Sequence, residues 1–248
     1  MIKIPKKFMG EPIKGSLEKV LADIDKAPTL EPEPSGTGTH TYHNGFVYIP
    51  TANLWFAEEI TLTNTNWYDC HKELAKQTLV LPNGSEKRLR MPTPKQTWGL
   101  ILYAKAHQDD PKLKKIYNDI LQKKPENKWR AEWQNARFIA GSGFNDLDLE
   151  TVIGIDSSGN LKTTKQPLEP CLGKSCYAKL NINSQGFLTE KSQDTDYNQE
   201  ENIYFWPPVN GRVARFVAGS GGAGLSCGGG PQFTDVSLGV RASAEGAS

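Results

Sequence analysis

The sequence predicts an α+β fold. Helical patterns with recognisable N-caps lie before residue 125, whereas the rest of the chain carries only short strand patterns separated by turn residues. Of the 248 residues, 37% are hydrophobic and 9% are aromatic, which is enough to build a packed core. Because strands and helices do not alternate along the chain, a parallel βαβ sheet is not expected.

Residues 1–45 are expected to form an N-terminal extension, and residues 46–248 the main domain. Ser16 is a suitable N-cap for a short helix that ends before Pro28. Residues 28–38 are too rich in proline and glycine to hold a regular element, so we interpret them as a linker.

The main domain is predicted to begin with strands. Phe46–Ile49 and Leu54–Ala57 are short runs of aromatic and β-branched residues, and Ile60–Leu62 continues that composition. A helix over Trp67–Leu74 is expected next, because its apolar residues recur at three and four positions and Asn64–Asn66 offers an N-cap.

Two further helices have clear starting patterns. Thr93 is followed by Pro94 at the first helical position and by Gln96 three residues after the cap, which is the capping-box pattern. Asp110 followed by Pro111 repeats the combination of N-cap and proline. Both segments continue with apolar residues at helical spacing, so both are predicted to be amphipathic helices.

The second half of the main domain predicts short strands at Phe138–Ala140, Val152–Ile155, Phe187–Leu188 and Ile203–Trp206. Gly141–Gly143 lacks the lysine of a phosphate loop, so a turn is favoured there. Acidic side chains follow in a strand-like alternation at Asp146, Asp148 and Glu150. A solvated strand face is favoured over a calcium loop, because the twelve-residue calcium-loop pattern is missing.

Charge and hydropathy exclude several classes of function. Lys and Arg total 29 against 28 Asp and Glu, so the net charge of +1 supplies no basic field for a nucleic-acid partner. No apolar run approaches the ~20 residues of a membrane span, and Met1–Lys7 is not followed by the apolar stretch of a signal peptide. The sequence therefore shows no recognisable targeting signal.

Local sequence assembles no catalytic, metal or cofactor site. No nucleophile stands beside a base and an orienting acid, and His71 has no neighbouring partner, although triads also form in space. Among the four cysteines, Cys171 and Cys176 either close a small disulfide loop or remain thiols, two alternatives of similar weight. Zinc would need further ligands at matching spacing, so no metal is expected.

The most informative segment is Gly211–Gly230, where eight glycines are interspersed with residues that pack. Taken as two strands, Phe216–Ser220 and Ala223–Cys227 place apolar residues on one face and almost only glycine, serine and valine on the other. The inward set is Phe216, Ala218, Ala223, Leu225 and Cys227. This division predicts packing on one face and free exchange of residues on the opposite face.

The same segment resembles the variable region of the variable proteins of diversity-generating retroelements. The likeness rests on R-V-A-R-F-x-A-x-S-x-x-A-x-L-x-C from Arg212 to Cys227, followed by Ser237–Ala242. Arg90–Trp98 is similar to the arginine, proline and capped-helix segment of the C-type lectin fold, on which the archaeal members are built. The likeness covers about residues 46–242, with a variable region at about 212–242.

The resemblance implies a non-enzymatic protein that displays a hypervariable ligand surface on a fixed C-type lectin scaffold. In that family, adenine-specific mutagenesis turns AAC or AAT codons into any codon ending in C or T, which excludes Gln, Glu, Lys, Trp and Met. The variable positions would be Val217, Gly219, Gly221, Gly222, Gly224, Ser226, Gly228, Gly229, Gly230, Gln232, Phe233, Thr234, Asp235 and Val236. Gln232 is outside the permitted set, so it is either fixed or reached from another codon. The scaffold residues would be Arg212, Arg215, Leu225, Leu238 and Arg241.

The resemblance further implies an unknown protein or surface ligand, no cofactor, a monomer, and display on a cell or virion surface. Two alternatives of the same fold stay open. An oxidase of the formylglycine-generating type would need a reactive cysteine pair near the C-terminus, where only Cys227 lies. A calcium-dependent sugar lectin would need Glu-Pro-Asn or Gln-Pro-Asp with Trp-Asn-Asp, whereas the chain offers Gln166-Pro167-Leu168.

The fold is expected to combine short helices with small antiparallel sheets. The variable positions are expected to share one exposed face of it, although they span two strands and a loop. Side chains introduced at Gly219, Gly224 or Gly229 should then change stability by less than about 0.5 kcal/mol. Leu225→Ala, by contrast, should cost roughly 2–5 kcal/mol in a thermal or chemical melt as a buried truncation.

Affinity for a protein ligand is expected to be micromolar or weaker. Binding energy concentrates in a few aromatic and arginine anchors, and Phe233 is the only aromatic residue among the variable positions. Phe233 and Asp235 are therefore expected to carry most of the affinity.

Overall fold

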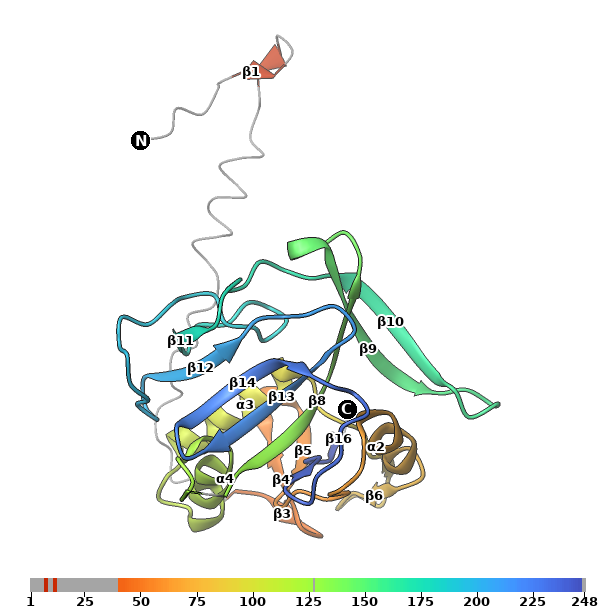
Figure 1. Cartoon of the computed structure of the whole chain (residues 1–248). Coiled ribbons are helices and arrows are strands. Elements are labelled where there is room, and N and C mark those ends of the chain that lie inside the picture. The colour runs from red at the N-terminus through yellow and green to blue at the C-terminus, as the bar shows by residue number, and fades with distance from the viewer. Residues whose placement is uncertain (1–6, 9–10, 13–39, 127, 247–248) are drawn as a thin grey trace. The chain divides into compact units, whose positions relative to one another are not determined.

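The described residues of the computed structural model are 7–8, 11–12, 40–126 and 128–246 (Figure 1). The chain divides into two units, residues 1–36 and residues 37–248. In the first unit, β1 (Lys7–Phe8) pairs with β2 (Glu11–Pro12) in antiparallel fashion. The helix expected after Ser16 lies outside the described residues.

The main unit begins earlier than the expected boundary at residue 46. Strand β3 (Tyr42–His43) pairs with β4 (Phe46–Ile49), so residues before 46 already belong to this unit. β4 continues through the 3-10 turn η1 (Pro50–Ala52) into β5 (Leu54–Ala57). The two strands predicted at the start of the domain are thus confirmed.

The described residues form three α-helices, α2 (Trp67–Leu74), α3 (Pro94–Ala106) and α4 (Pro111–Leu121). Each begins at a predicted cap, since the side chains of Asn66, Thr93 and Asp110 accept hydrogen bonds from backbone N–H groups of the first turn. In α3, Gln96 completes the capping box with Thr93. None of these helices is long and apolar enough to cross a lipid bilayer.

The main sheet has eight strands, in the order β10-β9-β8-β13-β14-β12-β11 with β15 beside β8. The strands are β8 (Arg130–Ala140), β9 (Leu147–Ile155), β10 (Leu161–Pro167), β11 (Cys176–Lys179), β12 (Asn202–Trp206), β13 (Val213–Gly219), β14 (Gly222–Gly229) and β15 (Leu238–Gly239). β12 runs parallel to β14 and β15 runs parallel to β8. The α+β class is confirmed, but the sheet is larger and more mixed than the small antiparallel sheets expected.

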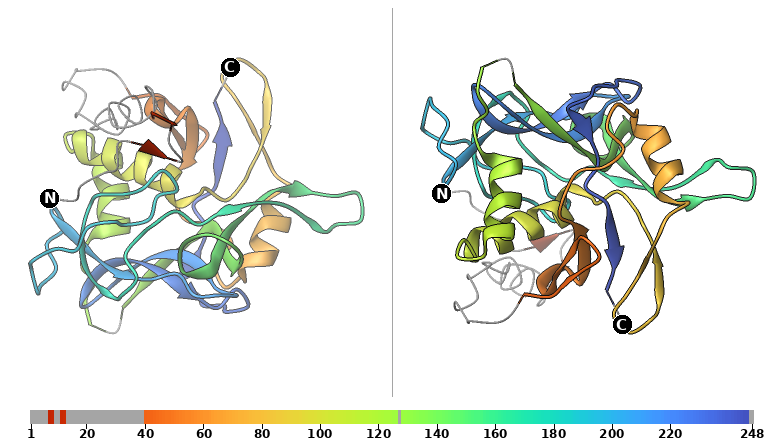
Figure 2. Two further views of the ribbon diagram at one scale, coloured as in Figure 1. Left: turned by 90° about the horizontal axis from the view of Figure 1, so that it is seen from above. Right: turned by 90° about the horizontal axis from the view of Figure 1, so that it is seen from below.

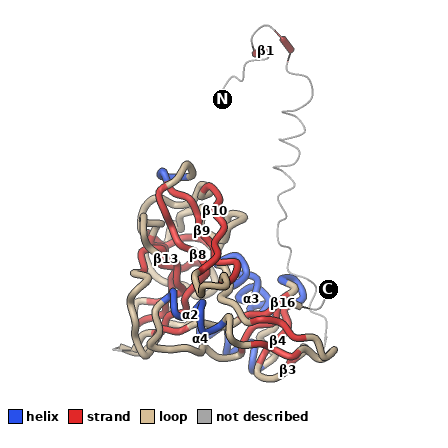
Figure 3. Tube along the Cα trace, turned by 90° about the vertical axis from the view of Figure 1, so that its right-hand side faces the viewer, coloured by secondary structure: helices blue, strands red, loops and turns tan. Residues whose placement is uncertain are grey.

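A four-stranded sheet, β16-β5-β4-β3, brings β16 (Ser243–Glu245) against β5. A separate hairpin pairs β6 (Thr78–Val80) with β7 (Glu86–Arg88). Helix α3 contacts both β4 and β8, and Figure 3 shows it between the two larger sheets. The hairpin of β9 and β10 extends beyond the rest of the main unit in both views of Figure 2.

Two apolar clusters hold these layers together. The first lies between α3, α4 and one face of the main sheet, and it includes Trp98, Phe138 and Leu225. The second joins α2, β5 and the C-terminal strands around Trp133 and Leu238. Both faces of β8 are therefore buried, and the main sheet is open to solvent mainly along β10, on β11 and at the outward residues of β12 and β13.

Two predicted strands are wrong. Phe187–Leu188 contributes only an isolated bridge at Leu188, and Ile60–Leu62 contributes only one at Thr61. Leu62 adopts a left-handed backbone with φ of 52°, which is incompatible with a continuous strand. The turn expected at Gly141–Gly143 is confirmed, and the 3-10 turn η2 (Phe144–Asp146) follows it.

Candidate ligand-binding surface

The glycine-rich C-terminal segment forms the centre of the main sheet. β13 and β14 pair as an antiparallel hairpin, with Phe216 opposite Leu225 and Val217 opposite Gly224. The predicted inward set is at most 2% exposed, and the Phe216 ring packs edge-on against Trp98 of α3 at a centroid distance of 5.3 Å. The expected alternation is confirmed for this face.

The opposite side of the hairpin continues across neighbouring strands. Residues that pair directly lie on the same side of a sheet, and Arg215, Ser226 and Trp206 are consecutive partners on β13, β14 and β12. A second row runs through Val217, Gly224, Tyr204 and Tyr177. The name outer face is used below for Tyr177, Tyr204, Trp206, Arg215, Val217, Gly224 and Ser226.

Most of the expected variable positions are partly or fully exposed. These are Val217, Gly219, Gly221, Gly222, Gly228, Gly230, Gln232, Phe233, Thr234, Asp235 and Val236. Gly224, Ser226 and Gly229 are buried, so the expectation of one exposed set is wrong at these positions.

The space around the glycines explains this difference. A Cβ atom at Gly224 would lie 2.4 Å from the carbonyl oxygen of Tyr204 and 2.6 Å from Cζ3 of Trp206. A Cβ atom at Gly229 would lie 2.9 Å from the carbonyl oxygen of Val213, whereas one at Gly219 would meet nothing within 4 Å. The expected tolerance at Gly224 and Gly229 is therefore wrong, because neighbouring strands and the Trp206 ring fill the space.

The variable loop, Gly230–Val236, follows β14 and is tied to the start of α2. The backbone N–H of Trp67 donates to the carbonyl oxygen of Pro231 at 3.0 Å, and that of Asn64 donates to the carbonyl oxygen of Asp235 at 2.9 Å. Phe233 is 45% exposed and Val236 is 75% exposed. The loop is thus held by its backbone while these side chains face solvent.

Arg215 occupies an unusual position between aromatic rings. Its guanidinium carbon lies 5.6 Å from the ring centroid of Phe233 and 5.9 Å from those of Trp129 and Trp133. Nε and Nη1 are buried without a hydrogen-bond partner among the described residues. Burial lowers the pKa of the guanidinium. Cation–π attraction is therefore the main contact of this charge.

The expected scaffold residues divide into two groups. Leu225 and Leu238 are fully buried and Arg241 is 1% exposed, as a supporting layer requires. Arg212 is exposed and Arg215 lies on the outer face, so these two do not lock the surface from beneath as expected. Because Arg215 directly precedes the inward Phe216, the alternation along β13 places it on the outward side, and Arg212 lies before the strand begins at Val213.

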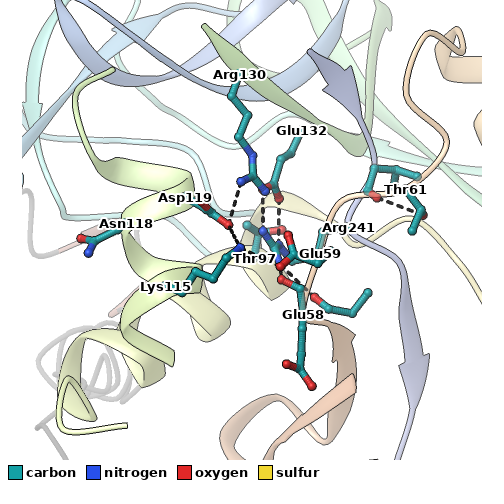
Figure 4. Close-up of polar contacts among 12 residues, drawn as sticks. Glu58, Glu59, Thr61, Thr97, Lys115, Asn118, Asp119, Arg130, Glu132 and Arg241 are labelled. Atoms are coloured by element: carbon teal, nitrogen blue, oxygen red, sulfur yellow. Dashed lines mark hydrogen bonds and ion pairs between the residues drawn. The ribbon is translucent and has the colours of Figure 1, made fainter. Parts of the chain in front are cut away.

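Arg241 begins a series of buried and half-buried ion pairs, called the ionic chain below (Figure 4). Its Nη2 and Nε contact the two carboxylate oxygens of Glu132 at 2.9 and 3.1 Å. Glu132 also accepts from Arg130 at 2.7 Å, and Arg130 contacts Asp119 of α4 at 2.8 Å. Burial alone would raise the pKa of Glu132, but Arg241 and Arg130 hold that pKa below its usual value.

The aromatic residues of β12 were not predicted as part of the surface. Trp206 is 39% exposed, and its ring centroid lies 4.6 Å from that of Tyr204, which in turn contacts Tyr177. Ile203 and Phe205, which alternate with them, are fully buried. This period of two in the sequence was the pattern that could have identified Tyr204 and Trp206 as outward residues.

Two titratable side chains that could have taken part in binding or catalysis, Glu150 and His71, are instead buried. Glu150 is 7% exposed and pairs with Arg137 at 3.0 Å, so it does not belong to a solvated face. His71 is 5% exposed, and burial lowers its pKa to about 3. Across the described ranges, no group of three His, Cys, Asp or Glu side chains is placed to hold a metal ion.

All four cysteines are free thiols in this structure, so Cys171 and Cys176 form no disulfide loop here. Burial raises the pKa of Cys171 to about 12 and that of Cys227 well above its usual value.

The outer face and the variable loop offer aromatic rings, one unpaired guanidinium and small residues as their contact groups. Comparisons of the chain with protein-family models, curated proteins and solved structures gave no significant match.

Proposed function

We propose that this protein binds a ligand through the outer face and the variable loop, and that a diversity-generating retroelement varies the part of this surface that lies within residues 212–242 on a C-type lectin scaffold. The observation that carries the proposal is the division of β13 and β14 into two sides. The inward side is at most 2% exposed at Phe216 and Leu225, whereas the outward side carries small residues beside exposed aromatic rings.

The physical support is the contrast between a rigid base and a side-chain-poor surface. The base is fixed by the apolar cluster under α3 and α4 and by the ionic chain. A recognition surface needs such support, because its contact residues must be held in place while their identities change. The retroelement accounts for the residue types at the expected variable positions, since all of them except Gln232 belong to the codon set that adenine mutagenesis produces.

The alternative oxidase of the same fold receives less support. Its chemistry needs a reactive thiolate, and the Cys227 thiol is fully buried with a pKa raised well above the usual range. No observation on the described residues favours the calcium-dependent lectin, whose carboxylate motif the sequence lacks.

The neighbouring DNA tests the diversification. We expect a near-copy of the segment that encodes residues 212–242, with adenines at the positions that differ, beside a reverse transcriptase gene. Codons for inward residues such as Phe216 and Leu225 serve as the internal control and should be identical in both copies. Differences that fall on the inward codons, or the lack of any such repeat, would contradict the proposal.

The binding surface itself is tested by substitution. Trp206→Ser and Phe233→Ser remove exposed rings from the outer face and the variable loop, whereas Ile153→Ser removes a side chain that is 65% exposed on β9. Peptides selected on the full chain from a phage-displayed random library are the probe. We expect the first two variants to weaken peptide binding and the third to leave it unchanged, as measured by calorimetry.

A further inference from the structure

The position of Arg215 is energetically unfavourable for the free protein. Nε and Nη1 are both buried, and neither has a hydrogen-bond partner among the described residues. Leaving a buried charged donor unpaired costs more than leaving out the charge altogether, and the rings at 5.6–5.9 Å compensate only in part. Such a group in a folded protein calls for a physical reason.

The surroundings of Arg215 supply no counter-ion. No carboxylate of the described residues forms an ion pair with Arg215 or with the neighbouring exposed Arg212. Asp235, the one acidic residue of the variable loop, accepts from the backbone N–H of Ser237 at 2.7 Å. The charge at this place on the surface is therefore positive and unbalanced.

The rest of the outer face shapes what can approach this charge. Ser226 stands directly opposite Arg215 on β14, and Trp206 is the next partner on β12. The small, buried Ser226 thus separates the guanidinium from the exposed indole in one row across the sheet. Because Nε and Nη1 are covered, an approaching carboxylate meets the guanidinium at Nη2, where it can form a charge-assisted hydrogen bond, and indole rings are frequent anchors in protein interfaces.

We infer that Arg215 receives a carboxylate side chain from an acidic polypeptide partner, which lies across the outer face with an apolar residue against Trp206. The inference rests on the proposed function, because it names the class of ligand for the same surface. A polypeptide is favoured over a nucleic acid, because a phosphate backbone needs several cations along its path and the outer face holds only one.

Selection of peptides provides the test. The full chain and its Arg215→Met variant are each used to select binders from a phage-displayed random peptide library. The methionine side chain fills a similar space among the rings without charge. Arg88→Gln, on the exposed hairpin of β6 and β7, removes one positive charge outside the main sheet and serves as the matched control.

We expect the peptides selected by the wild type and by Arg88→Gln to be enriched in Asp or Glu beside an aromatic residue. Affinity for such a peptide should fall by ~10-fold or more with Arg215→Met, and equally when its Glu is replaced by Gln, because a charge-assisted pair is lost. Arg215→Lys keeps the charge on a more flexible side chain, so it should give an intermediate affinity and serves if the Met variant does not fold.

Two sets of results would overturn the inference, and they separate it from the proposed function. Selected peptides without acidic enrichment, or with equal affinity for Arg215→Met, contradict the inference alone if Trp206→Ser still abolishes their binding. Peptides that bind equally well to Trp206→Ser and Phe233→Ser contradict the proposed surface as a whole. Binding of a single-stranded oligonucleotide that depends on Arg215, in place of acidic peptides, also overturns the inference.

Discussion

At the scale of single residues, two glycines of the same strand should respond in opposite ways to an added methyl group. A Cβ atom at Gly224 would collide with a carbonyl oxygen and with the Trp206 ring, whereas one at Gly228 would meet nothing within 4 Å. We expect Gly224→Ala to lower the free energy of unfolding by about 1–3 kcal/mol, as other overpacked sites do. Gly228→Ala should change it by less than about 0.5 kcal/mol.

Urea denaturation of both variants measures this difference. Since the two substitutions are identical in chemistry and lie on one strand, β-propensity cancels between them. Equal stability of the two variants would mean that the Trp206 ring moves aside easily, and that Gly224 is free to vary after all.

A second prediction at this scale concerns the pH dependence of stability. Burial lowers the pKa of His71 from 6.5 to about 3, and the ring packs edge-on against Trp67 at a centroid distance of 4.4 Å. Below pH 6.5 the unfolded chain binds a proton at this position and the folded chain does not. Stability should therefore decrease as pH falls from 6.5, by about 2 kcal/mol between pH 6.5 and pH 5.

His71→Phe should remove this part of the pH dependence, because phenylalanine does not titrate. Chemical denaturation at several pH values between 5 and 7 provides the measurement, and His43→Phe on β3 is the control. A slope that is the same in wild type and His71→Phe would show that the buried imidazole accepts a proton in the folded state.

At the scale of secondary-structure elements, α3 depends on its capping box. The Thr93 hydroxyl accepts from the backbone N–H of Gln96 at 3.3 Å, and the Gln96 side chain accepts from the N–H of Thr93 at 2.9 Å. Thr93→Ala should cost about 1 kcal/mol of unfolding free energy in urea denaturation. Lys95→Ala, at an exposed position of the same helix, should change stability little, and a similar loss in both variants would contradict the capping role.

The helices could be predicted because the residues that start them are local. Asn66, Thr93 and Asp110 each bond to a backbone group within three positions along the chain. β8 could not be predicted at its true length, because its buried polar residues are satisfied by distant partners. Gln134 bonds to Thr97 at 2.6 Å, and Asn135 bonds to the backbone of Val152. A pattern of hydrophobic residues cannot identify such buried polar residues.

The candidate surface could be predicted only on one side of the hairpin. Alternation along β13 and β14 was sufficient to identify Phe216 and Leu225 as buried. The contribution of Trp206 depends on the parallel pairing of β12 with β14, which joins segments that are distant in sequence. The burial of Gly224 has the same origin, so no local pattern could have revealed it.

At the scale of the whole molecule, the ionic chain joins the C-terminal segment to β8 and α4. Glu132 is 2% exposed and accepts from both Arg241 and Arg130, so removing its charge leaves the buried Arg241 without its carboxylate partner, whereas Arg130 keeps Asp119. We expect Glu132→Gln to cost about 3–5 kcal/mol, as measured by urea denaturation at neutral pH. Glu245→Gln breaks an exposed pair with Arg90 and should cost less than about 1 kcal/mol.

The same carboxylates predict how the protein responds to acid. The pKa values of Glu132 and Asp119 are held below their usual 4.5 and 3.8 by the neighbouring cations, against the opposing effect of burial. The unfolded chain therefore takes up protons first as pH falls, and the contribution of the ionic chain is lost from about pH 4.5 downwards. Glu132→Gln should flatten this acid limb, and an unchanged limb would contradict the assignment.

The Trp206 ring above Gly224 also limits which sequences produced by the proposed diversification can still fold. If codons at all variable positions change independently, copies that place a side chain at 224 lose stability before any ligand selects among them. The number of folded sequences is then set by open positions such as Gly219 and Gly228 rather than by the number of mutable codons. If the proposed diversification takes place, glycine should persist at 224 across natural copies while 219 and 228 vary, because the Tyr204 carbonyl and the Trp206 ring leave no space for a side chain at 224.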